Sequence, residues 1–311
     1  MRITPGRKRQ QFLAVHCNQC ALVSSSGQML GAGLGEEIDK IQCVIRMNNA
    51  PTAGYEEDVG SLTSLRVVSH TSVPLLQFLA VHCNQCALVS SSGQMLGAGL
   101  GEEIDKIQCV IRMNNAPTAG YEEDVGSLTS LRVVSHTSVP LLVKNELYYF
   151  HQAANTTYVF WGPDSKMRQD GKGQIFNVLL KIAKKYPNVK MYSMTSEKIK
   201  YCDQVFQNET GKNRMKTGAF LSTGFFTMIL ALNVCDSIQI YGMINDNHCS
   251  QENRSLVPYH YYEQNRVEEC RMYRVHEHKK RGGHRFITEK AIYAKWAKWH
   301  KIVFKHPAWS L

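Results

Sequence analysis

Short runs of apolar residues recur along the chain from residue 86 onward, and polar or glycine-containing segments separate them. The runs CALV at 86–89 and CVIRM at 109–113 have the length and composition of buried strands. By the same pattern we expect further strands at 131–134, 158–161, 190–192, 237–242 and 302–304.

Longer segments between these runs carry apolar residues at helical spacing. IFNVLLKIAKKY at 175–186 has lysines on the opposite face and ends at a proline, which predicts a helix. The apolar stretch 225–232 is too long for a typical strand and predicts a buried helix. Residues 288–301 predict an amphipathic helix that includes Trp296 and Trp299.

Strands that alternate with helices indicate an α/β protein with a Rossmann-like, mostly parallel sheet and helices on both faces. Ligands of such sheets bind beyond the carboxyl ends of the strands. Two polar segments follow predicted strands directly, SSSG at 90–93 and NNAP at 114–117. The sequence therefore predicts a binding site built from these loops.

A perfect internal repeat complicates this picture, because residues 77–142 (the second copy) repeat residues 11–76 (the first copy) over 66 positions. Solenoid and propeller units recur every roughly 20 to 50 residues and need about three copies to bury a core. Two copies followed by unrelated sequence indicate an in-frame duplication or an assembly error, so one copy is surplus. Removing 66 of 311 residues leaves 245, which suits one large α/β domain.

The net charge of the chain and its distribution indicate which class of partner the protein binds. A net charge of +10 is compatible with nucleic acid, an anionic membrane surface or an anionic small substrate. The positive residues are scattered, with dense clusters only at 7–9 and 278–281, and no nucleic-acid-binding motif is present. We therefore expect no nucleic-acid partner and favour a substrate that carries phosphate or carboxylate.

Ten cysteines and three glycosylation acceptor patterns, at Asn155, Asn208 and Asn253, indicate an oxidising secretory compartment. No apolar run reaches the roughly 18 to 20 residues of a membrane span. We expect membrane attachment only through an N-terminal anchor that this sequence lacks. Cys83 and Cys86 are spaced as a zinc half-site or a redox pair, but the only other such spacing is their own duplicate, which disfavours a four-cysteine site.

Two histidines stand in segments that favour acid–base or phosphate chemistry. In HRFITE, His284 precedes a predicted helix and Glu289 falls in its first turn, so His284 can take a proton from a hydroxyl; alternatively, it only caps the helix near Thr288. His260, in PYHYYE at 258–263, can donate to a phosphate, or it lies in an aromatic core loop. The SSSG segment alone is typical of turns.

Four segments, in matching order and spacing, resemble the signature motifs of the animal sialyltransferases. They are the long motif at 86–134, the short motif at 221–242, the motif from His260 to Glu263, and His284-x4-Glu289. The resemblance covers residues 81–311. VSHTSVPLL, ETGKNR, VPYHYYEQ and GGHRFITEKAIYAKWAK are similar to the alpha-N-acetylgalactosaminide alpha-2,6-sialyltransferase subgroup, types III and IV.

The resemblance implies a sialyltransferase variant of the GT-A fold that moves sialic acid from CMP-sialic acid to the 6-hydroxyl of GalNAc in sialylated Gal-GalNAc glycoproteins or glycolipids. His284 would be the general base, His260 would stabilise departing CMP, and Glu289 would assist. The implied donor-binding residues are Ser91, Ser92, Gly93, Asn114, Ser222, Thr223, Gly224 and Tyr261. Related enzymes often carry Asn in place of Ser91 and Trp in place of Phe225. The alternative is an inactive glycan- or nucleotide-binding remnant, disabled by the duplication and a lost N-terminus.

The resemblance further implies residence in the Golgi lumen or membrane and no cofactor. CMP-sialic acid is a co-substrate with a single phosphate, and no Asp-x-Asp pair for a metal occurs in the chain, so we expect no metal. The domain plan is a basic stub at 1–10, an accessory or poorly packed first copy at 11–76, and a catalytic domain at 77–311. The second copy is expected in the sheet, because it runs directly into Val143 in the family's register.

The resemblance also pairs Cys86 with Cys235 in a disulfide. From the cysteines that remain, we assign Cys249 to Cys270 and Cys109 to Cys202. Cys83 would pair with an upstream cysteine in relatives, and the repeat replaces that region here.

Overall fold

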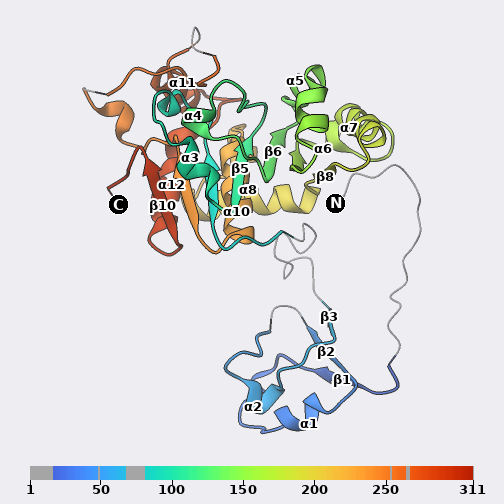
Figure 1. Cartoon of the computed structure of the whole chain (residues 1–311). Coiled ribbons are helices and arrows are strands. Elements are labelled where there is room, and N and C mark those ends of the chain that lie inside the picture. Colours follow the sequence, from blue (N-terminus) through green and yellow to red (C-terminus); the bar gives the residue numbers. More distant parts are fainter. Residues whose placement is uncertain (1–16, 48–49, 68–80, 253, 264–266, 311) are drawn as a thin grey trace. The chain divides into compact units, whose positions relative to one another are not determined.

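The computed structural model describes residues 17–47, 50–67, 81–252, 254–263 and 267–310. They form two compact units, one with the described residues up to 67 and one with those from 81 onward (Figure 1). The basic stub 1–10 and the acceptor Asn253 lie outside the described residues.

The larger unit contains a seven-stranded sheet in the order β10-β9-β4-β5-β6-β7-β8, in which neighbouring strands are parallel (Figure 1). Every strand begins and ends within two residues of a predicted one, because each predicted run is rich in apolar residues and is bounded by polar or turn-forming ones. Their bounds are β4 (Cys86–Val89), β5 (Cys109–Met113), β6 (Leu131–Ser135), β7 (Thr157–Trp161), β8 (Lys190–Ser193), β9 (Ile238–Tyr241) and β10 (Ile302–His306).

Helices connect these strands. The α-helices are α3 (Gly101–Asp105), α4 (Glu122–Val125), α5 (Val139–Lys144), α6 (Asp164–Met167), α7 (Gln174–Lys185), α8 (Ser196–Thr210), α9 (Arg214–Thr217), α10 (Thr223–Val234), α11 (Glu269–His278) and α12 (Phe286–Ala297). The sequence did not predict α8 or α11, which bury few apolar side chains. Helix α12 ends four residues before the predicted end, so Trp299 lies outside it and is 82% exposed.

Helices cover both faces of the sheet. On one face Cys86 is bonded to Cys235, which follows α10, and α10 packs on β5 and β6. Side chains alternate along a strand, so Ala87 and Val110 point to the other face, where they share a core cluster with Ile104 of α3 and Val125 of α4. The predicted α/β class with a parallel, doubly covered sheet is confirmed.

The strand order reverses between β4 and β9. The chain proceeds from β4 to β8 on one side of β4 and then returns to place β9 and β10 on the other side. Ligand sites of open parallel sheets lie at such a reversal, beyond the carboxyl ends of the strands. The topology therefore predicts a ligand site at the loops that follow β4, β5 and β9.

The smaller unit is the described part of the first copy. It forms a separate parallel sheet of β1 (Cys20–Val23), β2 (Cys43–Met47) and β3 (Leu65–Val67), with short helices α1 (Gly35–Asp39) and α2 (Glu56–Val59). The seven-stranded sheet thus takes β4, β5 and β6 from the second copy.

The larger unit has three disulfides. Cys86 is bonded to Cys235 and Cys249 to Cys270, as expected. The expected pairing of Cys109 with Cys202 is wrong, because Cys109 is bonded to Cys83, for which no partner in this chain was predicted. Pairing of β4 with β5 sets Cys86 opposite Cys109 and brings the Cα of nearby Cys83 within 6.2 Å of that of Cys109.

Cys202 is a free thiol on the buried side of α8, where burial raises its pKa to about 12. Since Cys83 and Cys86 are both oxidised in disulfides, their sulfurs are not thiolate ligands for zinc. Among the described residues, no helix combines the length and the apolar character that crossing a bilayer requires.

The repeat provides a matched pair for testing the packing at Gly93. A Cβ at Gly93 would lie 2.4 Å from the backbone oxygen of Pro258, whereas one at Gly27, the same position in the first copy, meets nothing within 4 Å. We expect Gly93→Ala to lower the stability of the larger unit by about 2 kcal/mol, a fall of roughly 4–8 °C in Tm by calorimetry. Gly27→Ala is the control and should leave that transition unchanged; equal shifts would contradict the packing.

Candidate functional site

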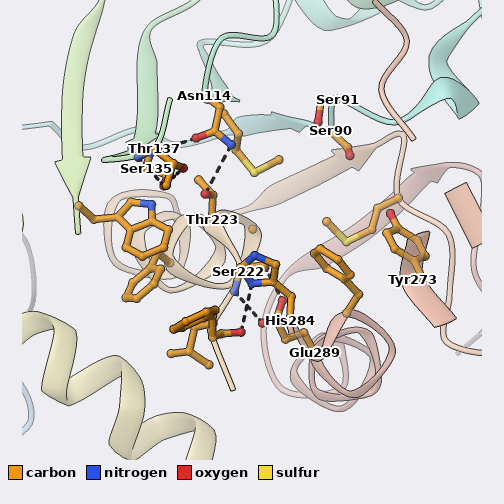
Figure 2. Close-up of a pocket in the computed structure, with 18 of the residues that line it drawn as sticks. Ser90, Ser91, Asn114, Ser135, Thr137, Ser222, Thr223, Tyr273, His284 and Glu289 are labelled. Carbon is orange, nitrogen blue, oxygen red and sulfur yellow. Dashed lines mark hydrogen bonds between the residues drawn. The ribbon is translucent and has the colours of Figure 1, made fainter. Parts of the chain in front are cut away.

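A pocket of about 540 Å³ lies at the carboxyl edge of the seven-stranded sheet. Its lining includes polar residues that follow four neighbouring strands: Ser90, Ser91 and Ser92 after β4, Asn114 after β5, Ser135, His136 and Thr137 at and after β6, and Trp161 at the end of β7. The first residues of α10, the loop at His260 and the start of α12 close it. Figure 2 shows Asn114, Thr223, Ser222 and His284 around this space.

Asn114 joins the sheet to α10. Its backbone has a φ of 48°, in the left-handed region that Asn tolerates better than most residues. In this conformation its side-chain oxygen accepts a hydrogen bond from the Ser135 N–H at 3.0 Å, and its amide donates to Thr223 Oγ1 at 3.5 Å. The amide therefore lies between β5, β6 and the start of α10, as the dashed lines in Figure 2 show.

The N-terminus of α10 points at the pocket. Ser222 is the N-cap, and its hydroxyl accepts from the Phe225 N–H at 3.0 Å. Thr223 and Gly224 form the first turn, where backbone N–H groups have no intrahelical acceptors and the helix dipole favours an anion. All three residues line the pocket, so this part of the predicted site is assembled in one place.

Glu289 holds this helix end against α12. Its carboxylate accepts from the backbone N–H of Ser222 at 2.8 Å and from the Ser222 hydroxyl. Glu289 is 2% exposed, and burial raises the pKa of its carboxyl to about 7, although the hydrogen bonds from Ser222 lower it. These contacts make Glu289 a positioning residue for the α10 N-terminus.

His284 is half-buried at the pocket wall, two residues before α12 begins. Its Nδ1 lies 3.1 Å from the carbonyl oxygen of Phe220, which can only accept, so Nδ1 carries the proton and Nε2 keeps a lone pair in the neutral ring. Burial lowers the pKa of His284, so the ring is mainly neutral at pH 7. Arg285, not His284, occupies the N-cap position, so the capping interpretation is wrong.

His260 lines the pocket from the loop that follows η4 (His248–Ser250). Its Nδ1 lies 2.9 Å from a Glu263 carboxylate oxygen, and its ring stacks on Tyr262 at 5.0 Å between centroids. A carboxylate only accepts, so Nδ1 donates here, and donation from Nε2 to a ligand oxygen would require the imidazolium form.

Two predicted donor residues lie outside the lining. Tyr261 is 1% exposed, packs in the core with Ile104 and Tyr241, and donates its hydroxyl to the Pro117 carbonyl. Gly93 donates its N–H to the Pro258 carbonyl at 3.0 Å. Gly93 thus holds the loop of His260 against the end of β4, and Tyr261 holds it against the segment after β5, so their observed contacts are structural.

His136 and Trp161 belong to the site although no sequence motif predicts a role for them. Both line the pocket, and among the described residues neither Nδ1 of His136 nor Nε1 of Trp161 has a hydrogen-bond partner. Burial lowers the pKa of His136. The sequence feature that could have identified them is their position at the carboxyl ends of predicted strands, the same position that Asn114 has.

Comparison with known proteins identifies the family of the chain. The family model described as glycosyltransferase family 29 (sialyltransferase) matches residues 2–81 and again residues 73–300. The chain belongs to this family. The two matches follow the repeat, since each covers one copy and only the second continues through the short motif and the two histidine motifs.

Several relatives share more than half of the aligned residues. Alpha-N-acetylgalactosaminide alpha-2,6-sialyltransferase 3 of Rattus norvegicus is 56% identical over 233 residues, which are 75% of this chain and 76% of the relative. The alpha-N-acetyl-neuraminyl-2,3-beta-galactosyl-1,3-N-acetyl-galactosaminide alpha-2,6-sialyltransferase of Homo sapiens is 54% identical over 227 residues, 73% of this chain and 75% of the relative. A crystal structure of a mammalian sialyltransferase with Gal-beta-1-3GalNAc-ortho-nitrophenol has a TM-score of 0.48 and 23% identity, over 75% of this chain and 73% of that chain.

The raised pKa of Glu289 gives a pH dependence of stability. Between the ordinary pKa of 4.5 and the folded pKa of about 7, the folded chain keeps a proton that the unfolded chain has lost, so the free energy of unfolding falls by roughly 3 kcal/mol as pH rises through this window. In Glu289→Gln the side chain is neutral at every pH, so its free energy of unfolding should not show this fall. Urea unfolding at pH 5 and pH 7.5 checks it: the variant should gain stability relative to the wild type at the higher pH, and parallel pH curves would contradict it.

Proposed function

We propose that the chain transfers sialic acid from CMP-sialic acid to the 6-hydroxyl of GalNAc in sialylated O-glycans or glycolipids. Family membership and the names of relatives that are 54–56% identical support this acceptor and linkage. No observation on the described residues favours the alternative of an inactive binding remnant.

One observation carries the mechanism: the hydrogen bond from Nδ1 of His284 to the Phe220 carbonyl, which leaves Nε2 as the basic atom at the pocket wall. In the proposed reaction Nε2 takes the proton of the acceptor hydroxyl. The hydroxyl oxygen forms a bond to the anomeric carbon of sialic acid while the bond from that carbon to the phosphate oxygen breaks, and the configuration inverts. The lowered pKa of His284 keeps the ring in the form that can accept this proton.

The departing CMP carries the negative charge that develops at the phosphate. Donors for it come from the α10 N-terminus at Thr223 and Gly224 and from His260 on the facing loop. Asn114, Ser91 and Ser92 are proposed to hold the nucleotide, since they line the same pocket at the ends of β5 and β4. With one phosphate to neutralise, these groups can act without a divalent metal, and activity in EDTA is expected to be unchanged.

We also propose residence in the Golgi lumen. The disulfides Cys83–Cys109, Cys86–Cys235 and Cys249–Cys270 support an oxidising compartment, where such bonds form and persist.

The general-base assignment is tested by His284→Asn, which can still donate to the Phe220 carbonyl but has no basic nitrogen. We expect kcat to fall about 10²- to 10⁴-fold, while the Kd for CMP stays near that of the wild type. His151→Ala, an exposed histidine outside the pocket lining, is the control and should keep full activity. Turnover of the Asn variant within threefold of wild type would remove His284 from the mechanism.

The unpartnered N–H of Trp161 is tested by Trp161→Phe, which keeps a ring beside Phe226 (4.2 Å between centroids) and removes only the donor. If a bound substrate accepts from this N–H, KM for that substrate should rise roughly tenfold, about 1–2 kcal/mol, while Tm stays equal or rises because a buried unsatisfied donor is gone. Steady-state kinetics with each substrate varied in turn identify which one is affected. Unchanged KM for both would mean that no substrate uses the donor.

A further inference from the structure

The first copy exposes a sheet face that the second copy buries. Leu22 is 68% exposed and Val67 is 57% exposed, whereas Leu88 and Val133, the same positions of the second copy, are fully buried. Cys20 is an exposed free thiol, and its counterpart Cys86 is buried and bonded to Cys235. Because the two sequences are identical, the difference comes only from what covers them.

The elements that cover this face in the second copy are known and occur once. Helix α10 packs on β5 and β6, β9 pairs with β4, and Cys235 between them bonds to Cys86. In the first copy β1, β2 and β3 pair with the same relative register as β4, β5 and β6. The exposed side of β1, β2 and β3 therefore has the side chains, the free strand edge and the thiol that α10, Cys235 and β9 recognise.

We propose that the first copy is a second docking site for the chain's own segment from Ser222 to Tyr241, so that the chain has two interchangeable folds. In the observed fold Cys235 is bonded to Cys86. In the exchanged fold β1, β2 and β3 take the places of β4, β5 and β6, Cys20 loses its thiol hydrogen and bonds to Cys235, and Cys86 becomes the free thiol. Exchange of thiolate and disulfide balances this step without an outside oxidant.

Chain connectivity sets the ratio of the two folds. All contacts of the repeat with α10 and β9 are available to either copy, but the exchanged fold must leave the domain after one copy and return after 66 residues, whereas the observed fold closes no such loop. Closing a flexible loop of this length disfavours the exchanged fold by about 500-fold, the 3/2 power of its length. The exchanged fold therefore becomes the more populated one when a substitution in the second copy lowers the population of the observed fold by more than this factor.

Matched variants of the repeat test the proposal. Leu88→Asp places a charge at a fully buried position of β4, and Leu22→Asp places it at the corresponding exposed position of β1. Trypsin followed by mass spectrometry without reduction distinguishes the copies, since Cys20 falls in fragment 10–40, Cys86 in fragment 67–106 and Cys235 in fragment 217–254. Wild type and Leu22→Asp should join fragment 217–254 to 67–106, with at most about 1% joined to 10–40.

Leu88→Asp should reverse this result, with fragment 217–254 joined mainly to 10–40, and the double variant Leu22→Asp/Leu88→Asp should lose the folded unit. Ile111→Asp with its counterpart Ile45→Asp repeats the test on β5. The proposal is overturned if Leu88→Asp never joins 10–40 to 217–254 and unfolds as fully as the double variant. Disulfide mapping needs no turnover, so this outcome is independent of whether the proposed transfer reaction is correct.

Discussion

The structure depends on covering both faces of a parallel sheet with a helix that the chain has only once. Each copy of the repeat supplies three parallel strands and two short helices, which cover one face. The other face of the second copy is buried under α10 and fixed by the bond between Cys86 and Cys235. Parallel sheets are stable when both faces are covered, so the single α10 can complete only one copy at a time.

The same helix organises the chemistry. Its N-cap, Ser222, is held by the buried carboxylate of Glu289, so α12 fixes the position of the α10 N-terminus. Just upstream of that N-cap, the carbonyl of Phe220 fixes the tautomer of His284. One short segment therefore positions the α10 N-terminus and Nε2 of His284 at the same pocket, which explains how residues far apart in the sequence form one site.

Much of this could be predicted from the sequence, and the failures have physical reasons. All seven strands of the large sheet were predicted because each is a short run rich in apolar residues between polar or turn-forming segments. Helices α8 and α11 were not predicted, because most of their side chains are exposed and they have too few buried apolar positions to show a helical pattern. The disulfide between Cys83 and Cys109 was missed because it depends on which strands are neighbours. The resemblance identified nine residues of the pocket lining, but the roles of Gly93, Tyr261 and Trp161 depend on contacts that spacing along the chain does not reveal.

The two copies of the repeat are identical in sequence but differ in structure, because only the second one belongs to the seven-stranded sheet. As sequence the repeat is two identical copies that each contain one long motif, but only one copy can be joined to the short motif and the two histidine motifs, which occur once. The most direct test is to incubate the purified chain with CMP-sialic acid and a sialylated Gal-GalNAc glycan and to determine the new linkage in the product by NMR. The account predicts one added sialic acid in inverted configuration on the 6-hydroxyl of GalNAc. Slow hydrolysis of CMP-sialic acid alone, or addition at another hydroxyl, would contradict it.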